Sequence, residues 1–299
     1  MGQPSARATL PSVHLPAASP LLRAAHLARR KPLGAAGLAA VVLWIAVALG
    51  APLLSFGQDP LAQEYIIRLQ GPSLRHWLGT DEFGRDVYAR ILYGARISLG
   101  ISFVGVGIGS TVGLAWGLVS GLARGWLDEL SMRLVDVLLA FPGLLLVMAL
   151  VAVMGTGVAS VVLALTILAC PRMARIMRGQ ALAVREATYV EAARAVGASS
   201  ARILLRHVLP NVVAPYLVLA TALLGSFVVT EATLSFLGLG VTPPQPSWGL
   251  MLSGGAQAYA QTAPWLVLFP GLAMTSLVMG FNLFGDALRD LWDPRLRGT

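Results

Sequence analysis

Charged residues are scarce in this chain of 299 residues, at only 12% of the sequence. A soluble domain carries about 25% charged residues. Hydrophobic residues make up 56%, and they are grouped in long blocks separated by short polar segments. This distribution excludes a soluble globular protein and predicts an all-α membrane protein, folded as a helical bundle.

Cysteine and catalytic motifs are also scarce. Because Cys170 is the only cysteine, the chain can form neither an internal disulfide nor a cysteine-based metal site. The sequence contains no H-E-x-x-H zinc helix and no phosphate-binding G-x-x-x-x-G-K-[ST] pattern. We therefore expect no catalytic residues, no metal and no cofactor in this chain, so that another protein must supply the energy for any active process.

Six apolar blocks are candidates for crossing a hydrocarbon core about 30 Å thick. The fourth is the shortest, because only residues 158–171 are free of charge. Arg172, Arg175 and Arg178 extend it on one helical face, from which their long side chains can reach the membrane surface. The sequence thus predicts six transmembrane helices, at residues 33–56, 98–123, 135–155, 158–176, 212–237 and 264–284.

The first apolar block has an alternative interpretation. Ala46, Val47 and Ala48 resemble the A-x-A cleavage site of a secretory signal peptide. The apolar run continues well past this point, however, and a long tail rich in Ala, Pro and Arg precedes it. These two features favour a retained first helix.

The basic residues favour one orientation of the six helices. With the N-terminus inside, 17 of the 22 lysines and arginines lie on the cytoplasmic side, the side on which short loops are enriched in these residues. We therefore expect cytoplasmic tails at residues 1–32 and 286–299, an extracytoplasmic loop at 57–97, and a five-helix core at 98–285 with a cytoplasmic loop at 177–211. Membrane orientation also explains the net charge of +8, so no nucleic-acid partner is expected.

The loop between the fourth and fifth predicted helices has the features of a docking element. Strong helix formers run through residues 185–196, and Tyr189, Ala192, Ala193 and Val196 share one face. Gly197 is placed to end this helix in a left-handed conformation. Ser199 can cap a second short helix running to Pro210. An ordinary amphipathic surface helix is the alternative that periodicity alone leaves open.

This loop resembles the EAA loop of ABC-importer permeases, which docks into a cleft of the cytoplasmic ATPase subunit. The resemblance rests on residues of fixed spacing: Glu191, Ala192, Ala193, Gly197, Leu209 and Pro210. It implies that Glu191 pairs with a basic group of the ATPase and that Gly197 permits the turn. His207 stands where the wider pattern has isoleucine, which leaves the packing of the second helix open.

A second motif, HWLGTDEFGRD at residues 76–86, precedes the second predicted helix. It resembles the H-x-L-G-T-D-x-x-G-R-D pattern of dipeptide, oligopeptide and nickel importer permeases. From the residues alone, its charged side chains form a locally paired, solvated turn: Asp81, Glu82, Arg85 and Asp86. A metal site at His76 and Asp81 is a weakly supported alternative, since one histidine and scattered carboxylates are few ligands.

The same family resemblance extends over nearly everything from residue 76 onward, including residues 231–249 and 282–294. Glu231 is a carboxylate well inside a predicted helix, where a charge costs at least about 2.5 kcal/mol and requires a partner or a watery path. Two interpretations of Glu231 are equally supported by the sequence. Glu231 and Ser235 line the translocation pathway, or Glu231 forms a structural hydrogen bond to a neighbouring helix.

The resemblance identifies the chain as the second permease type of such an importer, with the type I permease fold. It implies a bacterial inner-membrane location in contact with lipid. The implied partners are a homologous permease, two ATPase subunits that bind ATP and magnesium, and an extracytoplasmic binding protein. The implied cargo is a short peptide, with nickel, glutathione or an oligosaccharide left open. An ion-coupled secondary transporter is the rival, but matching half-repeats are not visible.

The topology can be tested by cysteine labelling. In a Cys170→Ser background, Ser73→Cys should react with an impermeant thiol reagent added outside intact cells, because residue 73 lies in the predicted outer loop. Ser199→Cys should react only after the membrane is permeabilised. The reverse labelling pattern would show that the predicted orientation is wrong.

Overall fold

The computed structural model describes residues 31–123 and 125–292, without the side chains of residues 254–257. Regular structure in these ranges is helical apart from one bridge between Thr80 and Asp86. The predicted tail at residues 1–32 lies almost wholly outside the described residues, as does the second half of the predicted tail at 286–299.

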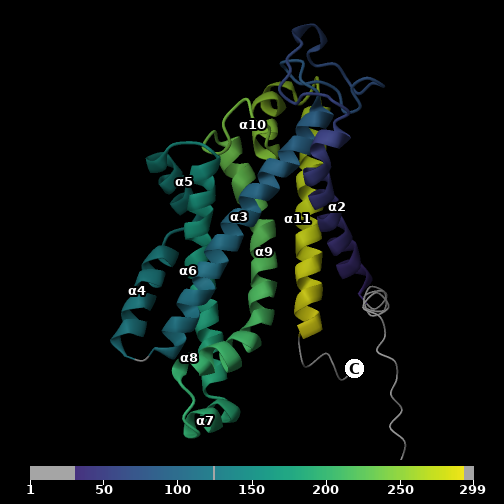
Figure 1. Cartoon of the computed structure of the whole chain (residues 1–299). Coiled ribbons are helices and arrows are strands. Elements are labelled where there is room, and N and C mark those ends of the chain that lie inside the picture. The colour runs from purple at the N-terminus through teal and green to yellow at the C-terminus, as the bar shows by residue number, and fades with distance from the viewer. Residues whose placement is uncertain (1–30, 124, 293–299) are drawn as a thin grey trace, which may run out of the picture. The chain divides into compact units, whose positions relative to one another are not determined.

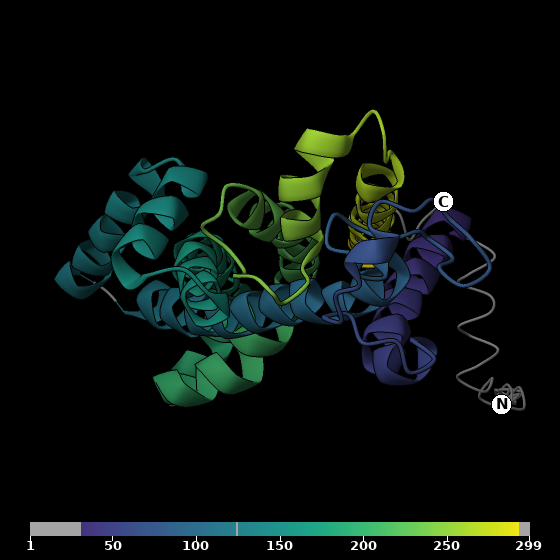
Figure 2. The same cartoon turned by 90° about the horizontal axis from the view of Figure 1, so that it is seen from above.

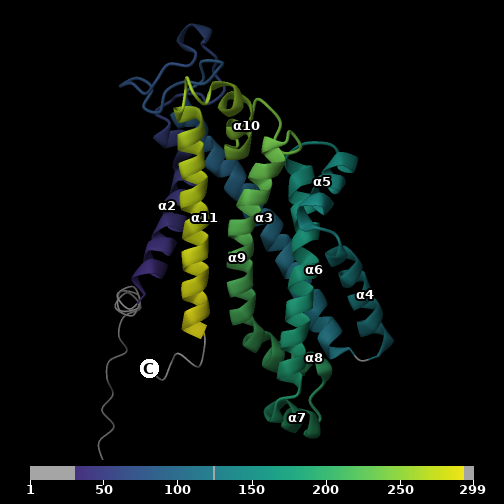
Figure 3. The same ribbon diagram turned by 180° about the vertical axis from the view of Figure 1, so that it is seen from behind.

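Five helices in the described part are long and apolar enough to cross a membrane, and a bent helix pair makes a sixth crossing if it counts as one span. The prediction of an all-α bundle with about six crossings is thereby confirmed. In Figures 1 and 3, four of the long helices run in nearly the same direction while α3 crosses them obliquely. The long helices are α2 (Pro32–Leu54), α3 (Val87–Leu122), α6 (Val158–Arg185), α9 (Leu209–Phe236) and α11 (Trp265–Trp292).

The third predicted helix, residues 135–155, is wrong as a single straight span. The structure has α4 (Trp126–Ala140) and α5 (Gly143–Met154), which meet at an angle of 91°. Pro142 explains the break, because a residue that precedes proline is sterically disfavoured in the helical region. Phe141 accordingly has extended angles, with φ −81° and ψ 137°.

Two other helices are longer than hydropathy predicts. Helix α3 begins at Val87 rather than at residue 98, because the Asp86 carboxylate caps it by accepting the Ala89 N–H at 2.8 Å. Helix α6 continues to Arg185 rather than ending at residue 176. In both cases arginines in the added turns make the segment too polar to count as a membrane span.

The arginines on α6 bind carboxylates of α4. Arg178 donates two hydrogen bonds to Asp128, at 2.7 and 2.6 Å, and Arg175 pairs with Asp136. The sequence predicted that the side chains of Arg172, Arg175 and Arg178 can reach the membrane surface. Instead, two of the three connect α6 to the amphipathic helix α4.

Helices α3 and α6 approach each other closely along a row of glycines. A Cβ atom added at Gly113 would lie 2.4 Å from the Cys170 carbonyl oxygen, and one at Gly117 would lie 2.4 Å from the Ala174 oxygen. Small residues at four-residue spacing permit such backbone contact between membrane helices. The row on α3 consists of Gly105, Gly109, Gly113, Gly117 and Gly121.

Glycines also bring α2 against α11. A Cβ atom at Gly37 would lie 2.7 Å from the Phe284 backbone nitrogen, and Trp44 Nε1 donates a hydrogen bond to Ser276 Oγ at 2.9 Å. Seen from above in Figure 2, α2 lies on one side of the bundle and the α4–α5 pair on the other. Helix α3 spans the distance between them.

The glycine row provides a stability test. Gly113→Ala places a methyl group against the α6 backbone and should destabilise the subunit by about 1–3 kcal/mol, the usual cost of overpacking. Gly107→Ala is the matched control, because it lies on the same helix with no neighbouring atom within 4 Å of an added Cβ. Melting temperatures of the two purified variants in detergent should differ, with only Gly113→Ala lowered. Equal melting temperatures would contradict the close contact.

Candidate functional site

The predicted docking loop contains a short helix, α7 (Thr188–Ala195), at the end of the bundle. The prediction of one helix from residue 185 is corrected, because α6 ends at Arg185 and α7 is a separate helix. Ala187 between them is extended, and its carbonyl oxygen accepts the N–H groups of Val190 and Glu191. This reorientation allows Val190 to be fully buried in the bundle core.

The turn after α7 has the predicted left-handed glycine. Gly197 has φ +85°, a conformation that residues with a Cβ adopt only with strain. The Ala198 N–H donates to the Ala193 oxygen, and the Gly197 N–H to the Arg194 oxygen, both at 3.0 Å. These two bonds form a Schellman motif, so the predicted helix end at Gly197 is confirmed.

The predicted second helix continues into the membrane-length helix that follows. Ser199 caps α8 (Ser200–Ile203) as predicted, accepting the Arg202 N–H. A π-helical turn, η2 (Leu204–Val208), then joins α8 to α9 without a break. Leu209 and Pro210 are therefore the first residues of α9.

The accessible side chains of α7 and of Val196, its C-cap residue, include charged, small and apolar groups. Glu191 and Ala192 are exposed, Ala193 is half-buried, and Val196 is 85% exposed. Glu191 forms no ion pair with another described residue. The exposed face of α7 is thus free for contact while Val190 anchors its other side.

His207, the departure from the family pattern, packs against α7. The rings of His207 and Tyr189 lie 6.1 Å apart. Asn211 Nδ2 donates to the Tyr189 hydroxyl at 3.3 Å. Residues of η2 and the first turn of α9 thereby support α7 from behind.

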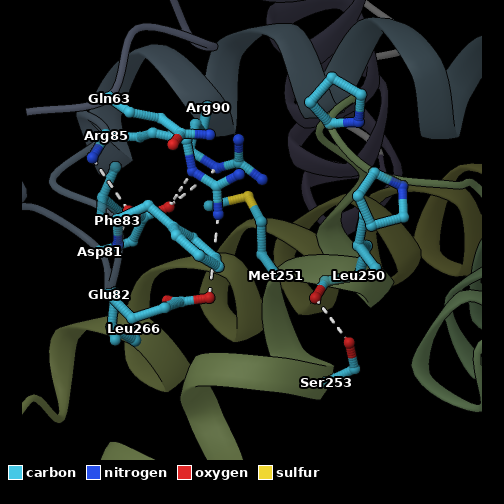
Figure 4. A pocket seen from close by; sticks show the side chains of 13 residues that line it. Gln63, Asp81, Glu82, Phe83, Arg85, Arg90, Leu250, Met251, Ser253 and Leu266 are labelled. Carbon is cyan, nitrogen blue, oxygen red and sulfur yellow. Dashed lines mark hydrogen bonds and ion pairs between the residues drawn. The ribbon is translucent and has the colours of Figure 1, made fainter.

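The charged motif at the opposite end of the bundle is buried, so its interpretation as a solvated turn is wrong. Asp81 accepts the N–H groups of Phe83 and Arg85 at 2.9 Å. It also binds Arg85 Nε at 2.6 Å and faces Arg90 Nε at 3.5 Å (Figure 4). All three charged side chains are less than 10% exposed. Sequence reasoning missed Arg90 as a member of this cluster because it falls one helical turn after the motif.

His76 pairs with Asp86 rather than with Asp81, at an Nδ1–Oδ2 distance of 2.8 Å. The other Asp86 oxygen caps α3, so this carboxylate connects the motif to the start of the helix. The alternative metal site at His76 and Asp81 is therefore not assembled, because Asp81 is surrounded by arginine and backbone donors.

Glu231 lies inside the chain rather than on an open face. Its side chain is 0% exposed, and its Oε1 accepts a hydrogen bond from Ser235 Oγ at 2.8 Å. Ser235 Oγ in turn accepts the Val241 N–H at 3.0 Å. Ser98 of α3 and Ser247, which caps α10 (Trp248–Tyr259), are also close to the carboxyl group. The two hydrogen bonds of Ser235 lie within α9 and between α9 and its following loop. Both interpretations of Glu231, as a pathway residue or as a partner of a neighbouring helix, stay predictions.

A buried tryptophan that sequence reasoning missed completes this region. Trp248 is fully buried, donates from Nε1 to the Ile91 oxygen at 3.1 Å, and stacks edge-on with Trp44 at 4.9 Å. It therefore connects α10 to both α3 and α2. Trp248 follows a proline-rich polar stretch and precedes Gly249, so no periodic pattern of apolar residues indicated that it would be buried.

Comparison with known proteins identifies the family of this chain. Residues 95–298 match the family described as the binding-protein-dependent transport system inner membrane component. The chain belongs to this family. This permease subunit is also 41% identical to the dipeptide transport system permease protein DppC of Alkalihalophilus pseudofirmus, over 94% of this chain and 92% of that protein.

Two glutathione transport system permease proteins, both GsiD, are similarly related to this permease. Identity is 44% for the Escherichia coli protein and 45% for the Pectobacterium atrosepticum protein, each over 86% of this chain and 85% of the relative. A solved structure of the MetNI methionine ABC transporter in an inward-facing conformation has a TM-score of 0.56 at 20% identity, covering 67% of this chain and 94% of that one. That likeness confirms the fold. This chain is accordingly a permease subunit of a binding-protein-dependent importer.

The buried charge cluster of the permease can be tested with a matched pair of variants. Asp81→Asn removes the counter-charge of two buried arginines and should cost about 3–5 kcal/mol of stability, as for other broken buried pairs. Glu129→Gln removes a carboxylate from an equivalent i,i+4 pair with Arg133, whose side chains are both 71% exposed; such a pair contributes below about 1 kcal/mol. Thermal unfolding of the two variants should differ accordingly. Equal stability would show that Asp81 is not the centre of the cluster.

Proposed function

We propose that this permease subunit imports short peptides and forms half of the translocation pathway beside a homologous second permease. Two ATPase subunits would bind ATP and magnesium, and an extracytoplasmic binding protein would deliver the substrate; this chain itself would hold no cofactor. Support for the cargo comes from the names of the relatives, since dipeptides and glutathione are both short peptides.

The exposed face of α7 is the observation that carries the coupling role. It presents Glu191 and small residues outward from a helix that Val190 anchors in the core. The glutamate would supply a charged hydrogen bond to a basic group of an ATPase subunit. The small side chains at Ala192 and Ala193 would allow close approach of the partner.

The connections of α7 would transmit movement to two membrane-length helices. At its start α7 follows α6 after only two residues, and at its end the Gly197 turn leads through α8 into α9. A displacement of α7 by the ATPase subunits would therefore act on α6 and α9 together. Residues 185–210 form this coupling segment.

The proposed orientation places α7 and both termini in the cytoplasm. Residues 172–206 contain seven of the 22 basic residues, as expected for a segment retained inside. The opposite end, with the Asp81 cluster and α10, would then face the binding protein.

Glu191 provides the first test of coupling. Glu191→Ala should leave insertion and folding unchanged, because the side chain is exposed, while weakening a contact worth about 1.5–3 kcal/mol. Substrate-stimulated ATPase activity of the reconstituted complex should fall about tenfold or more. Glu186→Ala, an exposed glutamate of the same segment outside α7, is the matched control and should retain stimulation. Equal activity of the two variants would remove the assigned role of Glu191.

Gly197 provides a second, independent test. Gly197→Val introduces a β-branched side chain at positive φ and should misdirect α8, so transport should be lost although the subunit still inserts. Gly179→Val is the control, since Gly179 has no neighbouring atom within 4 Å and a helical conformation. Uptake by proteoliposomes, with membrane expression measured alongside, separates coupling from insertion. Normal uptake by Gly197→Val would mean that the turn has no coupling role.

A further inference from the structure

A cavity of about 410 Å³ lies at the end of the bundle opposite α7. It is enclosed by the loop before α3, the first turns of α3, the loop before α10, and α10 itself. Ligand sites in proteins range from about 300 to 1,000 Å³ and combine apolar walls with a few converging polar groups. The cavity matches this description, with apolar walls that include Phe83, Val87, Met251 and Leu266.

Two arginines form the polar part of the cavity. Arg85 and Arg90 both line it and share the carboxylate of Asp81 (Figure 4). Their positions are fixed before any ligand arrives. The Arg85 guanidinium lies over the Phe83 ring at 4.4 Å, and Arg90 Nη1 donates to the Pro60 oxygen at 3.1 Å. Such preorganisation lowers the entropic cost of binding.

The remaining acidic group of the cavity is weakly held. Glu82 lies 3.8 Å from Arg85 Nη2, beyond ordinary hydrogen-bond length, and its side chain is 24% exposed. Asp81, by contrast, already accepts hydrogen bonds from two backbone N–H groups and from Arg85. A second, better placed carboxylate could therefore displace Glu82 from Arg85 without disturbing Asp81.

We propose that this cavity binds the terminal carboxylate of a peptide substrate, with Arg85 as its principal ligand and the apolar wall receiving a side chain. This inference rests on the proposed function, because it takes short peptides as the cargo. The carboxylate replaces Glu82 beside Arg85, so that the cavity exchanges one weak internal ion pair for a charge-assisted hydrogen bond to the substrate. Met251, on α10, supplies an adaptable apolar surface that suits varied side chains.

The test uses the assembled transport complex in lipid nanodiscs, without the binding protein. Alanylalanine and its C-terminal amide are titrated by calorimetry, because the two probes differ only in the carboxylate. The amide should bind about tenfold more weakly or not at all, given the strength of charge-assisted hydrogen bonds. Equal binding of the two probes, or no binding of alanylalanine, would overturn the inference.

Two variants locate the binding in the cavity. Met251→Trp fills the space and should abolish alanylalanine binding. Glu82→Gln removes the competing carboxylate and should tighten binding about threefold or more, a gain that misfolding cannot produce. Glu64→Gln, in the same loop but outside the cavity lining, should leave affinity unchanged. Failure of Glu82→Gln to tighten binding would show that the ligand does not take the place of Glu82.

ATP-driven uptake separates this inference from the proposed function. If proteoliposomes with the binding protein import alanylalanine but Met251→Trp binds the dipeptide as the wild type does, the cavity assignment is wrong and the peptide importer stands. If no peptide is imported by the wild type, the proposed cargo fails. If Met251→Trp abolishes stimulation by the binding protein while dipeptide binding is undetectable in every variant, the cavity receives a group of the binding protein, and the substrate site is overturned.

Discussion

The direct contact of the α3 and α6 backbones is the constraint on which the arrangement of this permease depends. Lipid tails are as apolar as leucine, so membrane helices associate through close packing and hydrogen bonds rather than through the hydrophobic effect. Five glycines spaced four residues apart form a row without side chains on one face of α3, and this row allows the α6 backbone to approach closely. Helix α3 begins beside the buried charge cluster, after Asp86, and α6 ends where the proposed coupling segment, residues 185–210, begins. Their contact therefore joins the two ends of the molecule.

Charged residues have distinct structural roles at the two ends. Around Asp81 they are buried and surrounded by backbone donors, so the cluster determines the conformation of one loop and the start of α3. Around Asp128 the carboxylate receives two hydrogen bonds from Arg178 and one from Ser120, which connects α4 to α6 and α3. Burial makes the first cluster intolerant of losing one partner. The second cluster holds α4, which the break at Pro142 turns away from α5, against α6 and α3.

The sequence was sufficient to predict the features that depend on local chemistry. Apolar length indicated the membrane helices, and a glycine after a helical run predicted the Schellman end at Gly197. Features that depend on contacts with residues distant in sequence could not be predicted from local patterns. Hydropathy is averaged over a window of residues, so the predicted third helix ran through the break at Pro142. The predicted fourth helix ended at residue 176, because the carboxylate that pairs with Arg178, Asp128, is distant in sequence. Polarity likewise suggested a solvated turn at Asp81, whereas Arg90 and the surrounding loop bury it. Glu231 was recognisable as unusual, but its hydrogen bond from Ser235, whose hydroxyl oxygen accepts the Val241 N–H, could not be predicted.

The different attachments of α6 and α9 have a consequence for the proposed coupling. Helix α6 packs closely against α3 along the glycine row from Gly105 to Gly121, so we expect the two helices to move together. Helix α9 is instead entered through a π-helical turn at residues 204–208, in which the regular hydrogen-bond pattern is altered, and such turns often occur at functional sites. A force applied at α7 would thus displace α6 and α3 as a rigid pair, while the π turn could absorb a difference in angle between α6 and α9.

At its far end, α9 is connected to the loop before α10 through Glu231 and Ser235. A change in the angle of α9 would therefore reach the cavity lined by Arg85 and Met251. Nucleotide-driven movement at one end and substrate contact at the other would in this way act through the same helix.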